Sequence, residues 1–396
     1  MASFRKTVDR RNFLKLGAVA TGAVVGGCGP SEESATPPTT LELGYRPLGG
    51  TGLRVSEVAF GAHHIDRPDL MRAALDVGIN TFCTSSHYLD GREEASLGEA
   101  IGTLADRRHE LVIVTGSTVR RGASTQKLLD DIDAALTRLR TDHIDVYYKS
   151  EVRTPDDLRV DALYEAFDRA RQAGKIGHLG LSGHAGGMEA CLNAAIAGGQ
   201  IEVFFIKYDF VSYPDQGEIL RRAAQQGIGT IVFKTNAGNR HREIKDLEAG
   251  GLSFQQATVK WALTSPDVAS VAVSMPNFDT IRQYTAAVGS TLSAPEVAML
   301  RRYADEMYDK YCRFCAECEA SCPRGVAVAD VNRYAMYFTG YGREKEAMQR
   351  YHALPDDCSA AACVGCEGPC DAACPFGRAV RAELLEAHRH LSFREA

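Results

Sequence analysis

The sequence predicts an α/β protein in which a (β/α)8 barrel is followed by a smaller, cysteine-rich helical domain. Eight short apolar segments alternate with amphipathic segments over residues 43–306, which matches eight strand–helix units. Nine of the twelve cysteines lie after residue 311, so the composition changes there and marks a second domain over residues 307–396. A chain of 396 residues has room for both domains, and its net charge of −6 gives no electrostatic footprint for nucleic acid.

The predicted strands are short apolar runs. Strands buried on both faces explain continuous runs such as residues 203–206 (VFFI). Residues 124–139 and 157–173 carry apolar side chains at three- and four-residue spacing, which predicts helices between the strands. The eight expected strands are Val58–Ala62, Thr81–Ser85, Leu111–Thr115, Ile144–Lys149, Ile176–Leu181, Val203–Tyr208, Gly229–Lys234 and Ser270–Ser274.

The first 42 residues are expected to direct export and to act as a tether. Residues 9–15 (DRRNFLK) match the twin-arginine motif, and the Gly/Ala-rich stretch that follows is too short for a permanent membrane span. Residues 25–28 (VGGC) resemble a lipobox ending at Cys28; the alternative is an ordinary cleavage site near Ala23. We therefore expect a signal peptide over residues 1–28 and a flexible linker over 29–42. The mature protein would be periplasmic, or membrane-anchored through a lipidated Cys28.

Two cysteine runs have the spacing of iron–sulfur ligands. The first is C-x2-C-x2-C-x3-C-P, and the second carries one extra residue between its second and third cysteines. In the two-cluster pattern each run gives its last cysteine to the other cluster, so we expect two [4Fe-4S] clusters. One would be held by Cys312, Cys315, Cys318 and Cys374, and the other by Cys363, Cys366, Cys370 and Cys322.

Zinc and disulfides are the alternatives for these cysteines. Zinc sites usually pair two C-x2-C knuckles and have no use for the C-x2-C-x3-C-P run. Cysteines three residues apart in a short turn pair poorly as disulfides. Cys358 belongs to neither run and is expected to be an idle thiol. The twin-arginine route transports folded proteins, which suits cofactors that are inserted before export.

Several segments of the predicted barrel resemble the aldo/keto reductase family. They are residues 45–56 (YRPLGGTGLRVS), 75–82 (LDVGINTF), 139–147 (LRTDHIDVY) and 174–176 (GKI), and they span most of the barrel. The cysteine-rich tail is similar to the ferredoxin-like two-cluster extension found on one branch of that family. The resemblance implies a (β/α)8 barrel, a ferredoxin-like domain and an oxidoreductase.

The resemblance matches the family's catalytic residues at one position of four. The family uses a tyrosine as the proton donor, assisted by an aspartate, a lysine and a histidine. Tyr88 falls on the tyrosine, whereas Cys83, Gly116 and Ser150 occupy the three other positions. A tyrosine without assistance has a pKa near 10 and donates protons slowly at neutral pH.

The positions that the family uses for nicotinamide are also changed. Residues 182–184 (SGH) replace a Ser-Asn pair, and Phe205 lies where a glutamine is expected. The remaining candidates for binding a cofactor are Ser182, Tyr208 and Lys234. An exported enzyme would also lack an NADPH pool, so we do not expect NADP(H) to be the working cofactor.

The ends of barrel strands are where function sits, and here they carry histidines, lysines and a tyrosine. The candidate catalytic residues are Tyr88, His87, Lys149 and His184, in a cationic pocket suited to an anionic or oxygen-rich substrate. Lys149 has the alternative of pointing into the helix layer, and Cys83 that of a small core residue.

Three functions remain open from the sequence. The first is an exported iron–sulfur oxidoreductase that passes electrons through the clusters to or from a small-molecule substrate. The second is a non-catalytic electron-transfer protein whose barrel docks a redox partner, which a closed barrel mouth would favour. The third is an NADPH-dependent carbonyl reductase. Residues 326–354 have a helical, aromatic-rich pattern and are expected to pack the clusters against the barrel.

Overall fold

The computed structural model of the protein describes residues 43–103, 105–119, 122–184, 188–212 and 216–392. The expected export motif, the lipobox at Cys28 and the linker lie outside these ranges. Within them, no helix is both long and apolar enough to span a membrane.

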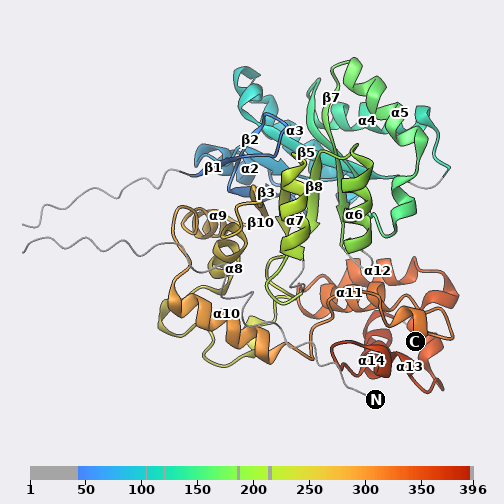
Figure 1. Ribbon diagram of the computed structural model, residues 1–396. Coiled ribbons are helices and arrows are strands. Elements are labelled where there is room, and N and C mark those ends of the chain that lie inside the picture. Colours follow the sequence, from blue (N-terminus) through green and yellow to red (C-terminus); the bar gives the residue numbers. More distant parts are fainter. Residues whose placement is uncertain (1–42, 104, 120–121, 185–187, 213–215, 393–396) are drawn as a thin grey trace, which may run out of the picture.

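Eight parallel strands form a closed barrel in the order β10-β3-β4-β5-β6-β7-β8-β9 (Figure 1). All eight strands expected from the sequence are present, with ends that differ by up to three residues. The fold class is therefore confirmed as a (β/α)8 barrel with a helical C-terminal region. The strands are β3 (Val58–Gly61), β4 (Thr81–Cys83), β5 (Val112–Thr118), β6 (Ile144–Ser150), β7 (Ile176–Gly183), β8 (Val203–Lys207), β9 (Gly229–Phe233) and β10 (Ser270–Ser274).

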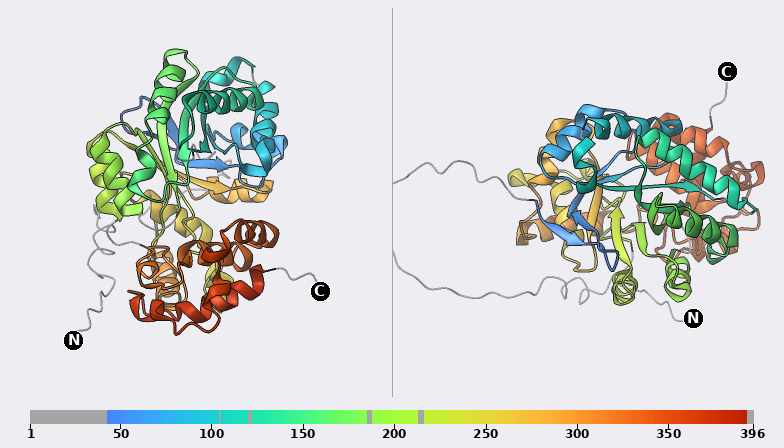
Figure 2. Two further views of the ribbon diagram at one scale, coloured as in Figure 1. Left: turned by 90° about the vertical axis from the view of Figure 1, so that its right-hand side faces the viewer. Right: turned by 90° about the horizontal axis from the view of Figure 1, so that it is seen from above.

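Helices surround the barrel on its outer face (Figures 1 and 2). The helix expected from residue 124 starts at Thr125, because the Ser124 hydroxyl accepts a hydrogen bond from Lys127 N and caps it. The helix expected from residue 157 starts at Asp161 instead, since Thr154 and Asp157 form a capping box around a short 3-10 turn. The helices are α2 (Pro68–Asp76), α3 (Arg92–Gly102), α4 (Thr125–Leu139), α5 (Asp161–Gln172), α6 (Met188–Gly198), α7 (Gln216–Gln225), α8 (Phe254–Leu263), α9 (Phe278–Thr285) and α10 (Ala294–Glu306).

An antiparallel hairpin of β1 (Tyr45–Pro47) and β2 (Arg54–Ser56) precedes the barrel. Its turn inserts Leu48, which is fully buried among the side chains inside the barrel. Gly49 has a φ of 55°, and a Cβ at this position would lie 2.4 Å from Gly227 O. Glycine therefore allows the hairpin to close against the start of β9.

Side chains on each strand alternate between the barrel interior and the helix layer. On β6, Val146 and Tyr148 belong to the interior cluster, whereas Tyr147 belongs to the cluster between strands and helices. On β8, Phe205 faces inward, and Phe204 and Ile206 face the helices. This alternation decides which predicted site residues can reach the barrel mouth.

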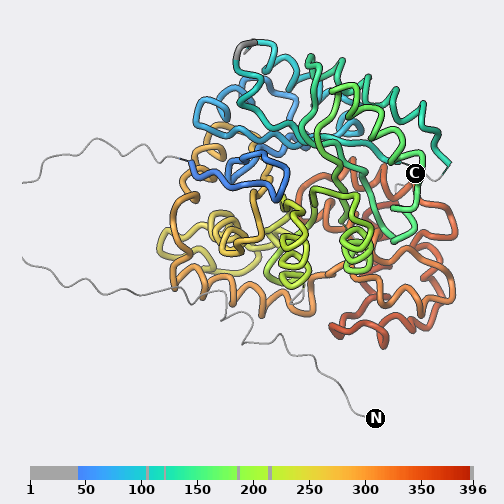
Figure 3. Tube along the Cα trace, turned by 45° about the horizontal axis from the view of Figure 1, so that its top comes forward, coloured from blue at the N-terminus to red at the C-terminus, as the bar shows by residue number. Residues whose placement is uncertain are grey.

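The C-terminal region is a set of helices packed against one end of the barrel (Figure 2, left). The chain enters it from α10, as Figure 3 shows by the change from orange to red. Apolar side chains of barrel loops, α10 and the C-terminal helices form one continuous core, with Phe254, Tyr303, Val331 and Leu384 among its members. The C-terminal helices are α11 (Val328–Thr339), α12 (Glu344–His352), α13 (Pro369–Ala373) and α14 (Val380–Leu391).

Candidate functional site

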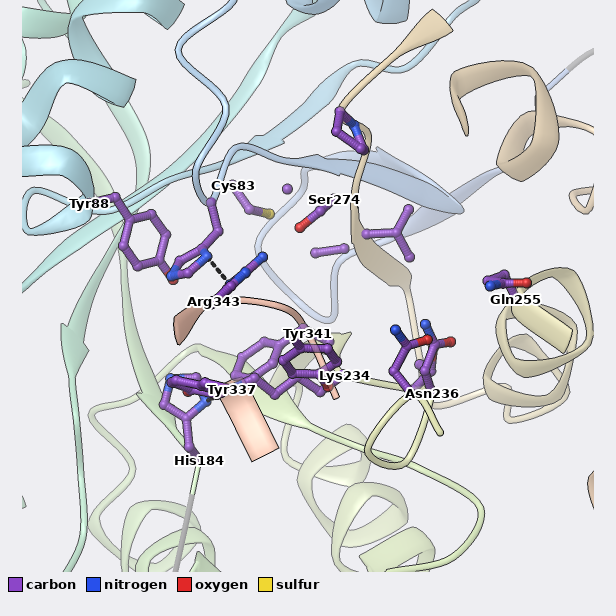
Figure 4. Close-up of a pocket in the computed structure, with 18 of the residues that line it drawn as sticks. Cys83, Tyr88, His184, Lys234, Asn236, Gln255, Ser274, Tyr337, Tyr341 and Arg343 are labelled. Carbon is purple, nitrogen blue, oxygen red and sulfur yellow. Dashed lines mark hydrogen bonds between the residues drawn. The ribbon is translucent and has the colours of Figure 1, made fainter. Parts of the chain in front are cut away.

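A pocket of about 410 Å³ lies where α11 and α12 cover the carboxyl ends of the barrel strands. The barrel contributes strand ends and the residues directly after them, and the C-terminal region contributes the opposite wall (Figure 4). The lining includes Cys83, His63, His87, Tyr88, Glu151, His184, Phe205 and Lys234 from the barrel, and Arg333, Tyr337, Tyr341, Arg343 and Arg350 from the C-terminal region.

Four of the residues predicted from the sequence meet in this pocket: His87, Tyr88, His184 and Lys234. They come from loops after three different strands, β4, β7 and β9. Cys83 also lines the pocket, where burial raises the pKa of its thiol well above its usual value. A thiol kept neutral in this way is a poor nucleophile.

Lys149 and Tyr208 do not face the pocket, which corrects the expectation for both. Each has the outward parity of its strand. Lys149 Nζ donates a hydrogen bond to Val119 O at 2.9 Å, in the helix layer. The Tyr208 ring stacks on Trp261 at a centroid distance of 4.8 Å, so it is packed between barrel and helices and is not free to stack on a cofactor.

Ser182 is buried on β7 and is not among the residues that line the pocket. With Tyr208 also turned away, Lys234 alone of the three predicted cofactor-binding residues reaches the pocket. The pocket therefore lacks two of the three side chains, Ser182 and Tyr208, that the sequence predicts to bind a cofactor.

Three arginines from the C-terminal region line the pocket, and the sequence analysis missed them. Arg333 lies on α11, Arg343 precedes α12, and Arg350 lies on α12. One feature of the sequence could have pointed to these arginines, namely their place between the two cysteine runs. Arg343 and Arg350 are seven residues apart, which is the spacing of two helix turns and puts them on the same side. The sequence alone did not show that this segment covers the barrel mouth.

The arginines are partly balanced by carboxylates. Arg350 Nε lies 2.8 Å from Glu346 Oε1, and its Nη1 lies 3.5 Å from Glu151 Oε1. Arg333 Nη2 lies 2.7 Å from Asp330 Oδ1. Four guanidinium groups, those of Arg242, Arg333, Arg343 and Arg350, line the pocket together with one carboxylate, that of Glu151, so the wall is cationic and favours an anionic ligand. Burial and the nearby arginines lower the pKa of Lys234 well below its usual value, so the charge of the wall rests on the arginines.

The pocket histidines are held neutral. Burial lowers the pKa of His63 to about 3. Burial followed by the charge of Lys234 lowers the pKa of His184 well below its usual value. Burial also lowers the pKa of His87, against the opposing charge of Glu151. Neutral imidazoles can both donate and accept hydrogen bonds, which suits them to orient a bound ligand.

His63, His64 and Glu346 place three potential metal-binding atoms within 4.8 Å of one another. Arg343 Nη1 donates to His63 Nδ1, because a guanidinium is always a donor. A neutral His63 therefore carries its proton on Nε2, which faces Glu346 Oε1 at 3.6 Å. That nitrogen has no lone pair for a metal, so the cluster is a polar network around Glu346 rather than a metal site.

Tyr88 has little in its surroundings that would help its hydroxyl to release a proton. Its ring makes edge contacts with His63 at 4.3 Å and His87 at 4.8 Å between centroids, and the structure gives its hydroxyl no hydrogen bond from any described residue. Burial, and then the charge of Glu93, raises the pKa of Tyr88 far above its usual value.

The cysteines gather in the two sets of four expected from the sequence. Cys312, Cys315, Cys318 and Cys374 line one small cavity, so the last cysteine of the second run lies with the first three of the first run. In the other set, burial and then the nearby thiols of Cys322, Cys370 and Cys366 raise the pKa of Cys363 to about 11. None of the cysteines in the described ranges forms a disulfide.

The separation of the sulfur atoms bears on which metal the sets fit. Four thiolates around one zinc ion at about 2.3 Å lie about 3.8 Å from one another. Within the described part of the chain, no three cysteine sulfurs lie within 4.8 Å of one another. The sets are therefore too wide for a single zinc ion and fit the larger core of a cubane cluster.

Comparisons with known proteins show which proteins the barrel is similar to. The model of the aldo/keto reductase family matches residues 63–250. The uncharacterized oxidoreductase YrpG of Bacillus subtilis is 26% identical over 314 residues, which cover 65% of this chain and 94% of that protein. L-galactose dehydrogenase of Arabidopsis thaliana is 26% identical over 250 residues, covering 59% of this chain and 74% of that protein. The holo form of an aldo-keto reductase from Bacillus halodurans superposes with a TM-score of 0.55 at 22% identity, covering 66% of this chain and 96% of that one.

A closed parallel barrel with polar side chains gathered at its strand ends belongs to the class of (β/α)8-barrel enzyme folds. Within that class, residues 63–250 match the model of the aldo/keto reductase family, and the proteins that the chain resembles include an oxidoreductase and a dehydrogenase. The comparisons thus support the resemblance for this part of the barrel.

Proposed function

We propose that the protein is an iron–sulfur oxidoreductase that acts on a small anionic substrate in the pocket between the barrel and the C-terminal helices. The two sets of four cysteines would hold two [4Fe-4S] clusters, which supply one-electron transfer when bound. The pocket residues bind and orient the substrate and supply protons.

The observation that carries this proposal is the course of α11. Val328 and Ala329, at its start, line the cavity of Cys312, Cys315, Cys318 and Cys374. Arg333 and Tyr337, further along the same helix, line the substrate pocket. At 1.5 Å per residue, Ala329 and Tyr337 are about 12 Å apart along the helix axis. One helix thus spans the short distance between a cysteine cavity and the pocket.

The charge of the pocket supports an anionic substrate. Arg333, Arg343 and Arg350 reach it from one side and Lys234 from the other. A carboxylate or similar oxyanion can take two parallel hydrogen bonds from a guanidinium, which fixes its orientation as well as its position. The anion would then hold a neighbouring reactive group against the ends of the strands.

An anaerobic NADPH titration of the cluster-loaded protein tests this function. Nicotinamide fluorescence and cluster absorbance are followed together, and dithionite is added afterwards. We expect no saturable NADPH binding and clusters that dithionite reduces. Saturable binding with bleaching of the clusters would contradict the proposal and favour an NADPH-dependent carbonyl reductase.

A non-catalytic electron-transfer protein remains the second candidate. The changed residues at positions 83, 116 and 150 suit it, but a relic barrel would be expected to have a filled mouth. The pocket of about 410 Å³ weighs against that interpretation.

Export by the twin-arginine route, with or without lipidation at Cys28, completes the proposal and rests on residues 9–28. Fractionation of cells that make the full chain, compared with a chain in which Arg10 and Arg11 are changed to Lys, tests it.

A further inference from the structure

A lysine, a tyrosine and a histidine from three different segments meet in the pocket. Lys234 Nζ donates a hydrogen bond to Tyr337 Oη at 2.7 Å and lies 3.2 Å from His184 Nδ1. The same ammonium group lies 4.6 Å from the centroid of the Tyr337 ring. Figure 4 shows the three side chains together on one side of the pocket, apart from Tyr88.

The direction of the hydrogen bond matters. Because the amine of Lys234 donates to Tyr337 Oη, the hydroxyl proton of Tyr337 points elsewhere. Tyr337 lines the pocket, and the structure gives its hydroxyl proton no acceptor among the described residues. The proton is therefore available to an acceptor atom in the pocket.

The local backbone is specialised for this contact. Lys234 directly follows β9 and has a φ of 57°, in the left-handed region that non-glycine residues seldom adopt. Residues held in such conformations cluster at functional sites. Here it turns the lysine from the barrel toward α11 of the C-terminal region.

The surroundings of the two tyrosines differ. Burial raises the pKa of both hydroxyls, but the guanidinium groups of Arg333 and Arg350 lower that of Tyr337 in return. The charges of Arg350 and Arg343 also lower the pKa of Tyr88, but there the opposing effects of Glu93 and Tyr337 are larger. The titratable and charged groups around Tyr337 are Lys234, His184, Arg333, Tyr341, Arg343, Glu346, Arg350 and Tyr88.

We propose that Tyr337, held by Lys234, is the residue that donates the proton to the substrate oxygen in this pocket, in place of Tyr88. The inference rests on the proposed function. Bound clusters would supply the electrons. In a two-electron reduction of a carbonyl group the C–O π bond would break, Tyr337 Oη would give its proton to the oxygen to form an O–H bond, and the carbon would take a second proton from water to form a C–H bond. Arg333 and Arg350 would stabilise the phenolate, which solvent would reprotonate along Lys234 and His184.

Fluorine NMR of the cluster-loaded full chain tests the assignment without any substrate. 3-Fluorotyrosine is placed at position 337 in one sample and at position 88 in another, and each resonance is followed against pH. We expect the phenol at 337 to ionise at a lower pH than the phenol at 88, which should stay protonated throughout the range in which the chain is folded. The substitution Lys234→Met should raise the ionisation pH at 337 by about one unit and leave that at 88 in place.

Two results would overturn the proposal: ionisation at 88 before 337, or a titration at 337 that Lys234→Met leaves unchanged. Melting temperature and iron content establish that each variant is folded, and Lys234→Arg, which keeps an N–H donor at this position, serves as the matched variant. Because the titration requires no electron transfer, it can fail or succeed independently of the NADPH and dithionite experiment.

Discussion

The main chain and ring of Tyr148 occupy the space that any side chain at position 116 would need. A Cβ on Gly116 would lie 2.0 Å from Tyr148 O and 2.6 Å from Tyr148 Cδ2. The ring is fixed in turn, since Tyr148 Oη donates to Thr84 O at 2.6 Å and the residue is buried. Position 116, which matches the family's lysine by resemblance, therefore has no space for a side chain. The packing of Tyr148 accounts for the absence of a lysine there.

Gly116→Ala should lower the free energy of unfolding by about 3 kcal/mol, at the upper end of overpacking costs, because a backbone oxygen cannot move aside as a flexible side chain can. Urea denaturation measures the effect. Gly102→Ala is the matched control, since a Cβ there would meet only Arg140 Cδ at 4.0 Å. Equal stabilities of the two variants would show that Tyr148 does not fill this space.

The sequence predicted the barrel well because burial of strands on both faces leaves continuous apolar runs, and all eight were found. It predicted Tyr88, His87, His184 and Lys234 because residues after strands lie at one end of a barrel. It failed at Lys149, where a shift of one residue along the strand reverses the side to which a side chain points. Contacts between distant segments, such as Lys234 with Tyr337, depend on how the C-terminal helices dock.

The docking of these helices depends on a buried carboxylate. Asp330 of α11 is 5% exposed and pairs with Arg153 of the barrel and with Arg333. Asp330→Ala would leave Arg333, itself 3% exposed, buried without this partner, at a cost of about 3–5 kcal/mol. Arg153→Ala removes a half-exposed partner and should cost about 1 kcal/mol.

Urea denaturation of the natural protein, Asp330→Ala and Arg153→Ala measures whether Asp330→Ala is the more destabilising change. The matched control is Asp156→Ala, which breaks an exposed pair with Arg159 and should change stability by less than about 0.5 kcal/mol. A similar small effect for Asp330→Ala would mean that α11 docks without the ion pair.

Glu93 should make the protein less stable as the pH rises. Burial raises the pKa of this fully buried carboxyl from 4.5 to about 8. Between those two values the folded protein keeps a proton that the unfolded chain has lost, so the free energy of unfolding falls with increasing pH. The dependence is absent below pH 4.5, where both states are protonated, and levels off above pH 8.

Glu93→Gln imitates the protonated carboxyl and should remove this dependence. Relative to the variant, the natural protein should lose about 2 kcal/mol between pH 6 and pH 8, as measured by urea denaturation at each pH. Glu99→Gln, on the exposed face of the same helix, is the control and should follow the natural protein. Parallel pH curves for all three would mean that Glu93 is ionised in the folded state.

The pocket should bind small dianions through its arginines. Oxalate serves as the probe, because its two carboxylates can accept paired hydrogen bonds from guanidinium groups. Arg350→Gln should weaken oxalate binding about tenfold or more in isothermal titration calorimetry, and added salt should weaken binding to the unaltered protein. Arg159→Gln changes an exposed arginine outside the pocket and should leave the affinity as it is. Equal affinity in both variants would place the anion elsewhere.

The exchange of cysteines between the two runs can be tested with pairs of substitutions. Cys318 and Cys374 line the same cavity, so the double variant Cys318→Ser/Cys374→Ser should lose one cluster and keep the other. Cys318→Ser/Cys370→Ser takes one ligand from each set and should damage both clusters. Iron analysis should then fall from about eight irons per chain to about four in the first variant and further in the second.

Spectroscopy separates the outcomes more sharply than iron content alone. After reduction with dithionite, the first double variant should give the electron paramagnetic resonance signal of one isolated cluster, without the broadening that two neighbouring reduced clusters impose on each other. If each run instead kept its own four cysteines, that variant would damage both clusters. Loss of both signals in Cys318→Ser/Cys374→Ser, in a chain that still melts cooperatively, would therefore reject the exchanged assignment.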